Sequence, residues 1–157
     1  MQKKKLKNKY KYTIVYILME NQELLNALDN DNNKNIINLN SKTIEEDKNE
    51  IINELNLAIK DKQNLIKKLS DYIYIDDLAH IKNGSYIRWI NINNPENIKL
   101  TIGGLICDIK YLDNGCHILC KNRFNKIMQI KMEETLIFQK LNNQEKVILN
   151  VVDYLQK

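Results

Sequence analysis

The chain has 157 residues, 43% of them hydrophobic and 28% charged, and a formal net charge of +4. This length suits one small domain with a helical extension, and the apolar run at residues 13–19 is far shorter than the roughly 20 residues that span a bilayer, so we expect no membrane span and no secretion. Three cysteines, an odd number, favour a reducing compartment and a cytoplasmic location.

The charges are distributed unevenly along the chain. Residues 1–12 contain six lysines and no acid, residues 41–80 contain six lysines and nine acids, and residues 81–141 contain nine basic and five acidic residues. Two basic regions are therefore separated by an acidic one. This asymmetry indicates an anionic partner, although a solvated tail that keeps the protein soluble is the plain alternative for the basic tip at residues 1–12.

Residues 1–40 are expected to form the first region of the chain. After the basic tip, apolar residues recur at helical spacing over residues 13–28, which predicts a short amphipathic helix. Such a helix could anchor the chain on nucleic acid or an anionic membrane, or it could dock on its own fold or a second copy. Residues 29–42 are rich in asparagine and are expected to be a linker.

A long helix is predicted for residues 41–80, running to about Ile75. Thr43, with Glu46 three residues later, forms a capping-box pattern that would start it. Isoleucines then recur every seven residues, with leucines at the complementary heptad positions and one lysine among them. The resulting seam consists of Ile52, Leu55, Ile59, Lys62, Ile66, Leu69 and Ile73.

The seam predicts self-association through a coiled coil. β-Branched residues at one heptad position with leucine at the other favour two parallel helices, and the polar Lys62 would lower stability while fixing the register. The alternative is that the same apolar stripe covers the β-domain within one chain. A stripe of this width suits either arrangement.

Residues 81–157 are expected to form a small β-domain with a closing helix. Short connections predict an antiparallel meander that closes into an SH3-like barrel of five strands. The C-terminal helix would occupy residues 142–157 and pack on the barrel or on the long helix. The strands are predicted at residues 85–92, 99–112, 116–122, 126–132 and 135–141.

A hairpin is predicted at Asp113-Asn114-Gly115, because Asn-Gly is a strong signal for a two-residue turn. With that turn, Tyr111 would face Ile118 and Ile109 would face Cys120. The predicted core face carries Cys107, Ile109, Tyr111, Cys116, Ile118 and Cys120.

The same alternation argues against zinc. His117 lies between cysteines in the sequence, but in a strand it points away from Cys116 and Cys120, whereas zinc needs convergent ligands. We therefore expect buried free thiols, no metal site and no cofactor. Gly103-Gly104 in the longest strand predicts a bulge or sharp bend, with a phosphate-binding loop as the weaker alternative because no helix follows.

The loop at residues 121–126 is the candidate surface for an anionic partner. Its basic residues surround an aromatic residue that could stack on a base while the cations contact phosphates. Alternatively, the aromatic ring plugs the open end of the barrel. Together with one residue of the first strand, the candidate surface consists of Arg88, Lys121, Arg123, Phe124 and Lys126.

No sequence motif of catalysis is present: the chain has no Gly-x-Ser-x-Gly, Walker loop, His-Glu-x-x-His or dinucleotide-binding glycine pattern. Asp76-Asp77 with His80 could in principle bind a metal, but an acidic end of a helix before a turn is the commoner origin of such a group. We expect the protein not to be an enzyme.

The β-domain resembles small uncharacterised β-barrel proteins of giant DNA viruses over residues 84–140. The resemblance is carried by Gly84-x-Tyr86-Ile87-Arg88-Trp89, Gly103-Gly104, Lys126-Ile127-x-Gln129-Ile130 and Ile137-Phe138. It implies a viral protein without enzymatic activity, located in the host cytoplasm or in the virion. It transfers no functional site.

These observations favour a non-catalytic assembly or adaptor protein, structural in the virion or associated with the virus factory. The long helix would oligomerise, and the barrel would present a basic surface to a protein partner. The alternative is a nucleic-acid-binding module that uses the basic tip and the loop at residues 121–126. A further alternative is an accessory subunit of a larger viral enzyme, without an active site of its own.

Overall fold

A computed structural model describes residues 21–156, which divide into two compact units. The first contains residues 21–41 together with residues 142–156, and the second contains residues 42–141. The basic tip and the first part of the predicted amphipathic helix lie outside the described residues. No helix within residues 21–156 is both long and apolar enough to cross a bilayer.

In the first unit, the asparagine-rich stretch is folded against the C-terminal helix. Residues 21–29 are helical, η1 (Asp31–Asn33) is a short 3-10 turn, and α4 spans Asn143–Leu155. The buried Asn33 side chain donates hydrogen bonds to the carbonyl oxygen of Ala27 at 2.8 Å and to Gln144 Oε1 at 3.0 Å. Asparagine amides therefore fix this segment where a free linker was predicted.

The start of α4 is set by a capping box that the sequence analysis did not identify. Asn142 Oδ1 accepts a hydrogen bond from the amide of Glu145 at 2.8 Å, and Glu145 Oε1 accepts one from the amide of Asn142 at 3.1 Å. Further along α4, Asp153 accepts hydrogen bonds from the amide and hydroxyl of Ser41 at 2.9 and 2.5 Å. These contacts tie the C-terminal helix to residues near the end of the asparagine-rich stretch.

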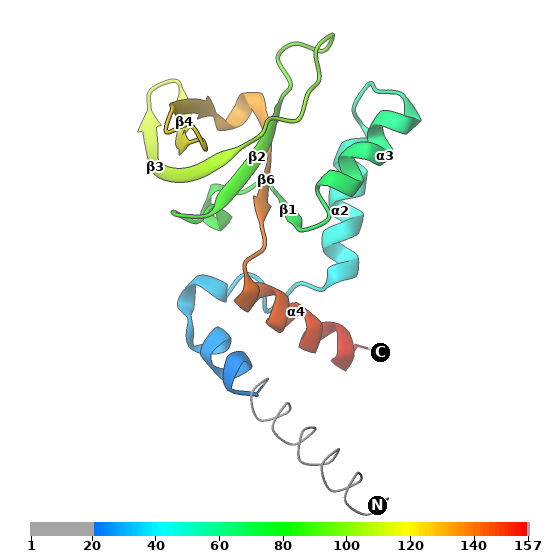
Figure 1. Cartoon of the computed structure of the whole chain (residues 1–157), viewed down its shortest axis with the longest axis vertical. Coiled ribbons are helices and arrows are strands. Elements are labelled where there is room, and N and C mark those ends of the chain that lie inside the picture. Colours follow the sequence, from blue (N-terminus) through cyan, green and yellow to red (C-terminus); the bar gives the residue numbers. More distant parts are fainter. Residues whose placement is uncertain (1–20, 157) are drawn as a thin grey trace, which may run out of the picture. The chain divides into compact units, whose positions relative to one another are not determined.

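The second unit is built on one antiparallel sheet of six strands (Figure 1). The predicted α+β class and the C-terminal helix are confirmed, and five strands match the predicted ranges to within one residue, apart from a later start of the longest strand. The additional strand is β1. The strands are β1 (Tyr72–Ile75), β2 (Tyr86–Asn91), β3 (Gly104–Leu112), β4 (Gly115–Lys121), β5 (Ile127–Lys131) and β6 (Thr135–Lys140).

The sheet is open, so the predicted closed SH3-like barrel of five strands is wrong. The strand order is β1-β6-β2-β3-β4-β5, and within the described residues β1 pairs with β6 alone and β5 with β4 alone. The meander holds from β2 to β5, but β6 returns between β1 and β2. The side chains of β6 explain this order. Leu136 and Phe138 are buried on one face of the strand and Ile137 on the other. A strand that is buried on both faces favours a central position in the sheet.

The sheet separates two hydrophobic clusters. Residues alternate between them along the central strands, as the period of a strand requires. The first cluster fills the inner side of the curved sheet and consists of Ile75, Ile81, Ile87, Trp89, Ile106, Ile118, Cys120, Ile130 and Ile137. The second lies between the sheet and the two helices α2 and α3 and consists of Ile52, Leu65, Leu69, Tyr72, Ile90, Leu136 and Phe138.

The predicted long heptad helix is wrong, because residues 41–75 form two short helices and a strand. α2 spans Ser41–Asn53, α3 spans Ile59–Lys68, and β1 follows (Figure 1). The helix starts two residues before Thr43, so Thr43 is not the N-cap. An unbroken helix from residue 43 to 75 would be about 50 Å long, whereas a six-residue strand spans about 20 Å. Breaking the helix lets both halves cover the same face of the sheet.

The β3–β4 hairpin forms at the predicted place, but its register differs by two residues. Tyr111 pairs with Cys116 and Ile109 with Ile118, because Gly115 alone takes a positive φ, 120°, and belongs to β4. The register then shifts at a bulge between Ile106 and Asp108.

The bulge moves the core position from Cys107 to Ile106. Ile106 is buried in the first cluster opposite Cys120, whereas Cys107 is exposed. Tyr111 is also exposed, near the tip of the hairpin. The predicted core face is therefore wrong at Cys107 and Tyr111, while the burial of Cys116, Ile118 and Cys120 is confirmed.

Candidate functional site

The predicted seam residues do not form one surface. Ile52 and Leu69 are 0% exposed in the second cluster, and Leu55 and Ile66 pack against it from its edge. Lys62 Nζ donates a hydrogen bond to the carbonyl oxygen of Asn53 at 2.7 Å, next to the break between the helices.

The two remaining seam positions lie apart from that cluster. Ile73 lies in β1 and packs against the first cluster, on the other side of the sheet, and Ile59 is 76% exposed at the start of α3. The apolar stripe thus serves mainly the core of its own chain, which was the alternative to the coiled coil.

The turn between β4 and β5 presents the candidate loop at residues 121–126. Asn122 fixes it: its Oδ1 accepts hydrogen bonds from the amides of Phe124 at 2.9 Å and Lys126 at 3.0 Å, and its own amide donates to the carbonyl oxygen of Lys126 at 3.0 Å. Asn125 adopts a φ of 62°, which asparagine tolerates better than most residues. Three hydrogen bonds of Asn122 thus define the conformation of this turn.

At the tip of this turn, Phe124 is 70% exposed and does not plug the sheet. The guanidinium carbon of Arg123 lies 4.8 Å from the centroid of the Phe124 ring, a cation–π arrangement. The turn therefore holds an aromatic ring and a cation together in solvent.

A second segment, residues 101–103, faces this turn and is fixed to β2. Arg88 Nε donates a hydrogen bond to the carbonyl oxygen of Thr101 at 2.8 Å, and the Tyr86 hydroxyl donates to that of Ile102 at 2.7 Å. Thr101 also exchanges hydrogen bonds with the backbone of Trp89, at 3.0 and 3.1 Å.

Gly103 completes the segment with a φ of 93°, just before β3 begins. The strand predicted to run through the glycine pair therefore begins only at Gly104, and the bulge of this strand lies further along, at Cys107. Arg88 contributes to the surface indirectly, because its side chain holds the backbone of the facing segment.

Between the two segments lies a pocket of about 300 Å³. Trp89, the chain's single tryptophan, and Met128 line it and also contact the first cluster, so the pocket opens toward the core of the sheet. No acidic side chain is among the described residues that line it. The lining residues are Trp89, Thr101, Ile102, Gly103, Asn122, Arg123, Phe124 and Met128.

Exposed apolar and basic side chains also lie on the other face of the sheet, beside this turn. Leu105, Lys121 and Ile127 are cross-strand neighbours on β3, β4 and β5, all three are exposed, and they point away from Ile106, Cys120 and Met128. Ile127 is 62% exposed and Ile102 57%. The predicted surface included Lys121, which strand alternation from the buried Cys120 places outward, but it did not include these aliphatic residues, because only charge and aromaticity indicated it.

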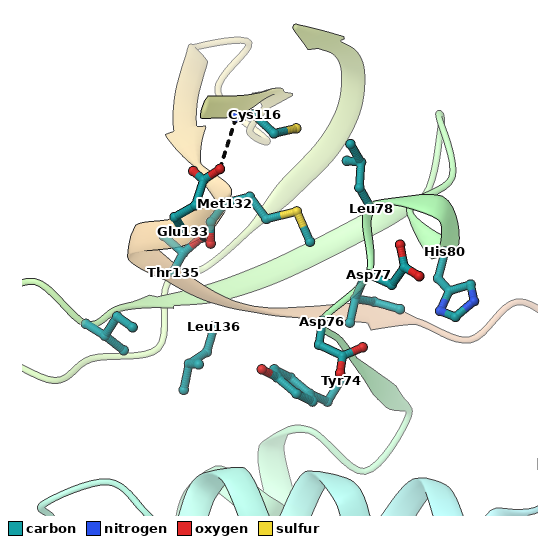
Figure 2. A pocket seen from close by; sticks show the side chains of 12 residues that line it. Tyr74, Asp76, Asp77, Leu78, His80, Cys116, Met132, Glu133, Thr135 and Leu136 are labelled. Carbon is teal, nitrogen blue, oxygen red and sulfur yellow. Dashed lines mark hydrogen bonds between the residues drawn. The ribbon is translucent and has the colours of Figure 1, made fainter. Parts of the chain in front are cut away.

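A larger hollow of about 800 Å³ lies beside β1 (Figure 2). Its opposite wall is formed by β4 and the 3-10 turn η3 (Met132–Glu134). Asp76, Asp77 and His80 come from the segment after β1, and Glu133 lies across from them. Two of these carboxylates accept hydrogen bonds from backbone amides. Asp77 Oδ1 accepts one from the amide of Ala79 at 2.9 Å, and Glu133 Oε1 accepts one from the amide of Cys116 at 3.2 Å.

Two groups that line this hollow have shifted pKa values. Burial, and then the charge of Glu133, raise the pKa of the Cys116 thiol, which disfavours the reactive thiolate. Hydrogen bonds from the amides of Glu133 and Cys116 lower the pKa of the Glu133 carboxyl. Within residues 21–156, no group of three His, Cys, Asp or Glu side chains could hold a metal ion.

His117 is engaged on the outer side of β4. Its two ring nitrogens lie 3.0 Å from Asn114 Oδ1 and 2.9 Å from Gln129 Nε2. Cys120, in contrast, is buried in the first cluster, where desolvation raises its thiol pKa to about 12. The histidine and the thiols thus lie on opposite faces of the strand, as the alternation predicts.

No protein-family model, curated protein or solved structure matches the chain.

Proposed function

We propose that the protein is a non-catalytic adaptor or assembly protein that presents the surface around residues 101–103 and 121–127 to a protein partner. The observation that carries the proposal is the presentation of Phe124, 70% exposed, next to an apolar pocket. Exposed aromatic and aliphatic side chains beside a pocket, rimmed by arginine and lysine, are typical of protein-binding surfaces. The viral setting implied by the sequence resemblance is part of the same proposal.

The aliphatic residues favour a protein partner over nucleic acid. Single-strand binding surfaces combine cations with several stacking aromatics, whereas Ile102, Leu105 and Ile127 offer bases no ring to stack on. Nucleic acid is the second candidate, because Arg123 over Phe124, with Lys121 and Lys126 nearby, could hold one base and its phosphates.

The helices α2 and α3 do not favour oligomerisation through the predicted seam. With Ile52 and Leu69 buried in the core of the same chain, the seam has little apolar surface left for a second chain. The proposal therefore assigns the interaction to the sheet.

The experiment compares partner capture by matched surface variants. Tagged wild-type protein, Phe124→Asp and Tyr111→Asp are cross-linked in cells that express the partner, and the captured proteins are quantified by mass spectrometry. Tyr111 is the matched control, because it is 75% exposed on the other hairpin of the same sheet. We expect one set of proteins to be retained by wild type and Tyr111→Asp and lost from Phe124→Asp. Equal capture by all three would refute the proposal.

Nucleic-acid binding is tested separately by fluorescence anisotropy with oligothymidine and oligouridine at low and moderate salt. Affinity that falls steeply with salt, and falls again with Arg123→Ala and Lys126→Ala, would support the second candidate. The absence of binding at low salt would remove it.

A further inference from the structure

The pocket between residues 101–103 and 122–124 is built before any ligand arrives. Both of its walls are fixed by hydrogen bonds: Arg88 and Tyr86 hold one, and Asn122 holds the other. A wall that is already ordered loses little conformational entropy on binding, so it favours a specific contact. The pocket thus differs from a gap between mobile loops.

Its size suits one large side chain. A volume of about 300 Å³ lies at the lower end of the range of roughly 300–1,000 Å³ for small-molecule sites. Trp89 and Met128 at the inner end, with Ile102 and Phe124 at the mouth, offer apolar contacts, and the remaining lining includes the polar Thr101 and Asn122. Buried aromatic side chains, tryptophan and tyrosine above all, are common anchors of a protein interface.

The positive charge near the mouth of the pocket indicates which kind of partner segment would carry this anchor side chain. Arg123 lines the pocket and Lys126 ends the same turn, whereas Lys121 projects from the opposite face of β4; no acid is among the described lining residues. A partner segment with carboxylates on either side of its anchor would match these cations, and a basic segment would be repelled.

We propose that this pocket binds one large apolar side chain carried by an acidic segment of the protein partner. The inference rests on the proposed function and specifies the partner's chemistry. Phe124 forms the outer wall against which the anchor packs, and Arg123, stacked on that ring, pairs with a flanking carboxylate. Trp89 forms the inner end, so its fluorescence reports whether the pocket is filled.

The test titrates the full chain with short synthetic peptides free of tryptophan, and follows Trp89 emission. The three probes are a phenylalanine flanked by glutamates, an alanine flanked by glutamates, and a phenylalanine flanked by lysines. We expect saturable change with the first, and at least tenfold weaker binding of the other two, about 1.4 kcal/mol or more. Phe124→Ala and Ile102→Glu should weaken the first peptide similarly, while Tyr111→Ala should not.

Several results would overturn the inference. They are equal binding of the alanine peptide, stronger binding of the lysine-flanked peptide, a Trp89 response that survives Ile102→Glu, and displacement of the first peptide by oligouridine. Because Phe124 and Ile102 are exposed, their variants should keep the wild-type urea midpoint, which separates lost binding from lost folding. If partner capture depends on Phe124 but no peptide changes the emission, this inference fails while the proposed function stands.

Discussion

The ammonium nitrogen of Lys48 lies 2.8 Å from the carbonyl oxygen of Leu69, the C-cap residue that follows α3. The same nitrogen donates to the carbonyl oxygen of Tyr72, at the start of β1, at 2.9 Å and to Glu45 Oε1 at 2.6 Å. The Lys48 side chain is fully buried. It joins α2, the C-terminal end of α3 and the edge strand through one charge, placed where the helix dipole favours a cation.

Replacing Lys48 with Met should destabilise the second unit strongly. The methionine keeps the buried volume but leaves two carbonyl oxygens and a carboxylate without their donor, which should lower the free energy of unfolding by about 3 kcal/mol. Urea unfolding, followed by circular dichroism, measures the change. Lys67→Met, at an exposed position of α3, is the control and should stay within about 0.5 kcal/mol of wild type. A Lys48 effect as small as that would mean its hydrogen bonds are dispensable.

Two glycines with positive φ should respond differently to alanine. A Cβ at Gly84, φ 80°, would meet nothing within 4 Å, whereas one at Gly103, φ 93°, would collide with the carbonyl oxygen of Ile87. Gly84→Ala should therefore cost about 1 kcal/mol of stability from backbone strain alone. Gly103→Ala should cost roughly 3 kcal/mol or more. Thermal unfolding of the two variants side by side decides this, and equal losses would contradict the close packing of residues 101–103 against β2.

Two isoleucines of the predicted seam give opposite predictions. Ile52→Asp places an unpaired charge in the second cluster and should lower stability by more than about 4 kcal/mol. Ile59→Asp should change stability by less than about 0.5 kcal/mol, because the residue is 76% exposed at the N-terminus of α3, where a carboxylate is favourable.

Light scattering on Ile59→Asp adds a second readout. The oligomeric state should match that of wild type, since this side chain faces solvent. Dissociation of an oligomer by this substitution would restore the coiled-coil hypothesis.

The thiols should label in a fixed order. Cys107 is exposed, whereas Cys116 and Cys120 are buried with raised thiol pKa values. With Ellman's reagent at neutral pH, we expect one fast thiol in the native protein and three in urea. Cys107→Ser should remove the fast phase. A second fast thiol would contradict the burial of Cys116 and Cys120, and a fast phase that survives Cys107→Ser would contradict the shift of the core position from Cys107 to Ile106.

Stability should decline at alkaline pH. Burial raises the pKa of Cys120 from 9.0 to about 12 and, to a smaller extent, the pKa of Tyr72 and Tyr74 above 10.0. The unfolded chain then releases these protons at lower pH than the folded chain, so ionisation favours unfolding. The stabilisation is complete below pH 9 and should be lost progressively toward pH 12. Cys120→Val keeps an apolar side chain and should flatten this dependence in urea titrations, whereas an unchanged slope would exclude Cys120 as its source.

The strands of residues 85–141 were predictable because their signals are local. Apolar alternation and the Asn-Gly turn are contained within each hairpin, so five strands match the structure closely. The exact register was less accessible: it depends on Gly115 alone taking a positive φ and on the bulge at Cys107. In the candidate site, the exposure of Phe124 and the facing segment at residues 101–103 depend on how two hairpins meet, which spacing along the chain does not encode.

By itself, the sequence determined the alternation of the strands, the C-terminal helix and a basic turn with an aromatic ring, since each follows from contacts between near neighbours in the chain. Only the tertiary structure decided that the isoleucine stripe would break into two helices over the sheet and that β6 would enter between β1 and β2. The reason is that an apolar stripe is buried against an apolar surface that lies close to it in the folded chain. For this stripe the nearest apolar surface is the chain's own sheet, whose length limits any helix that covers it.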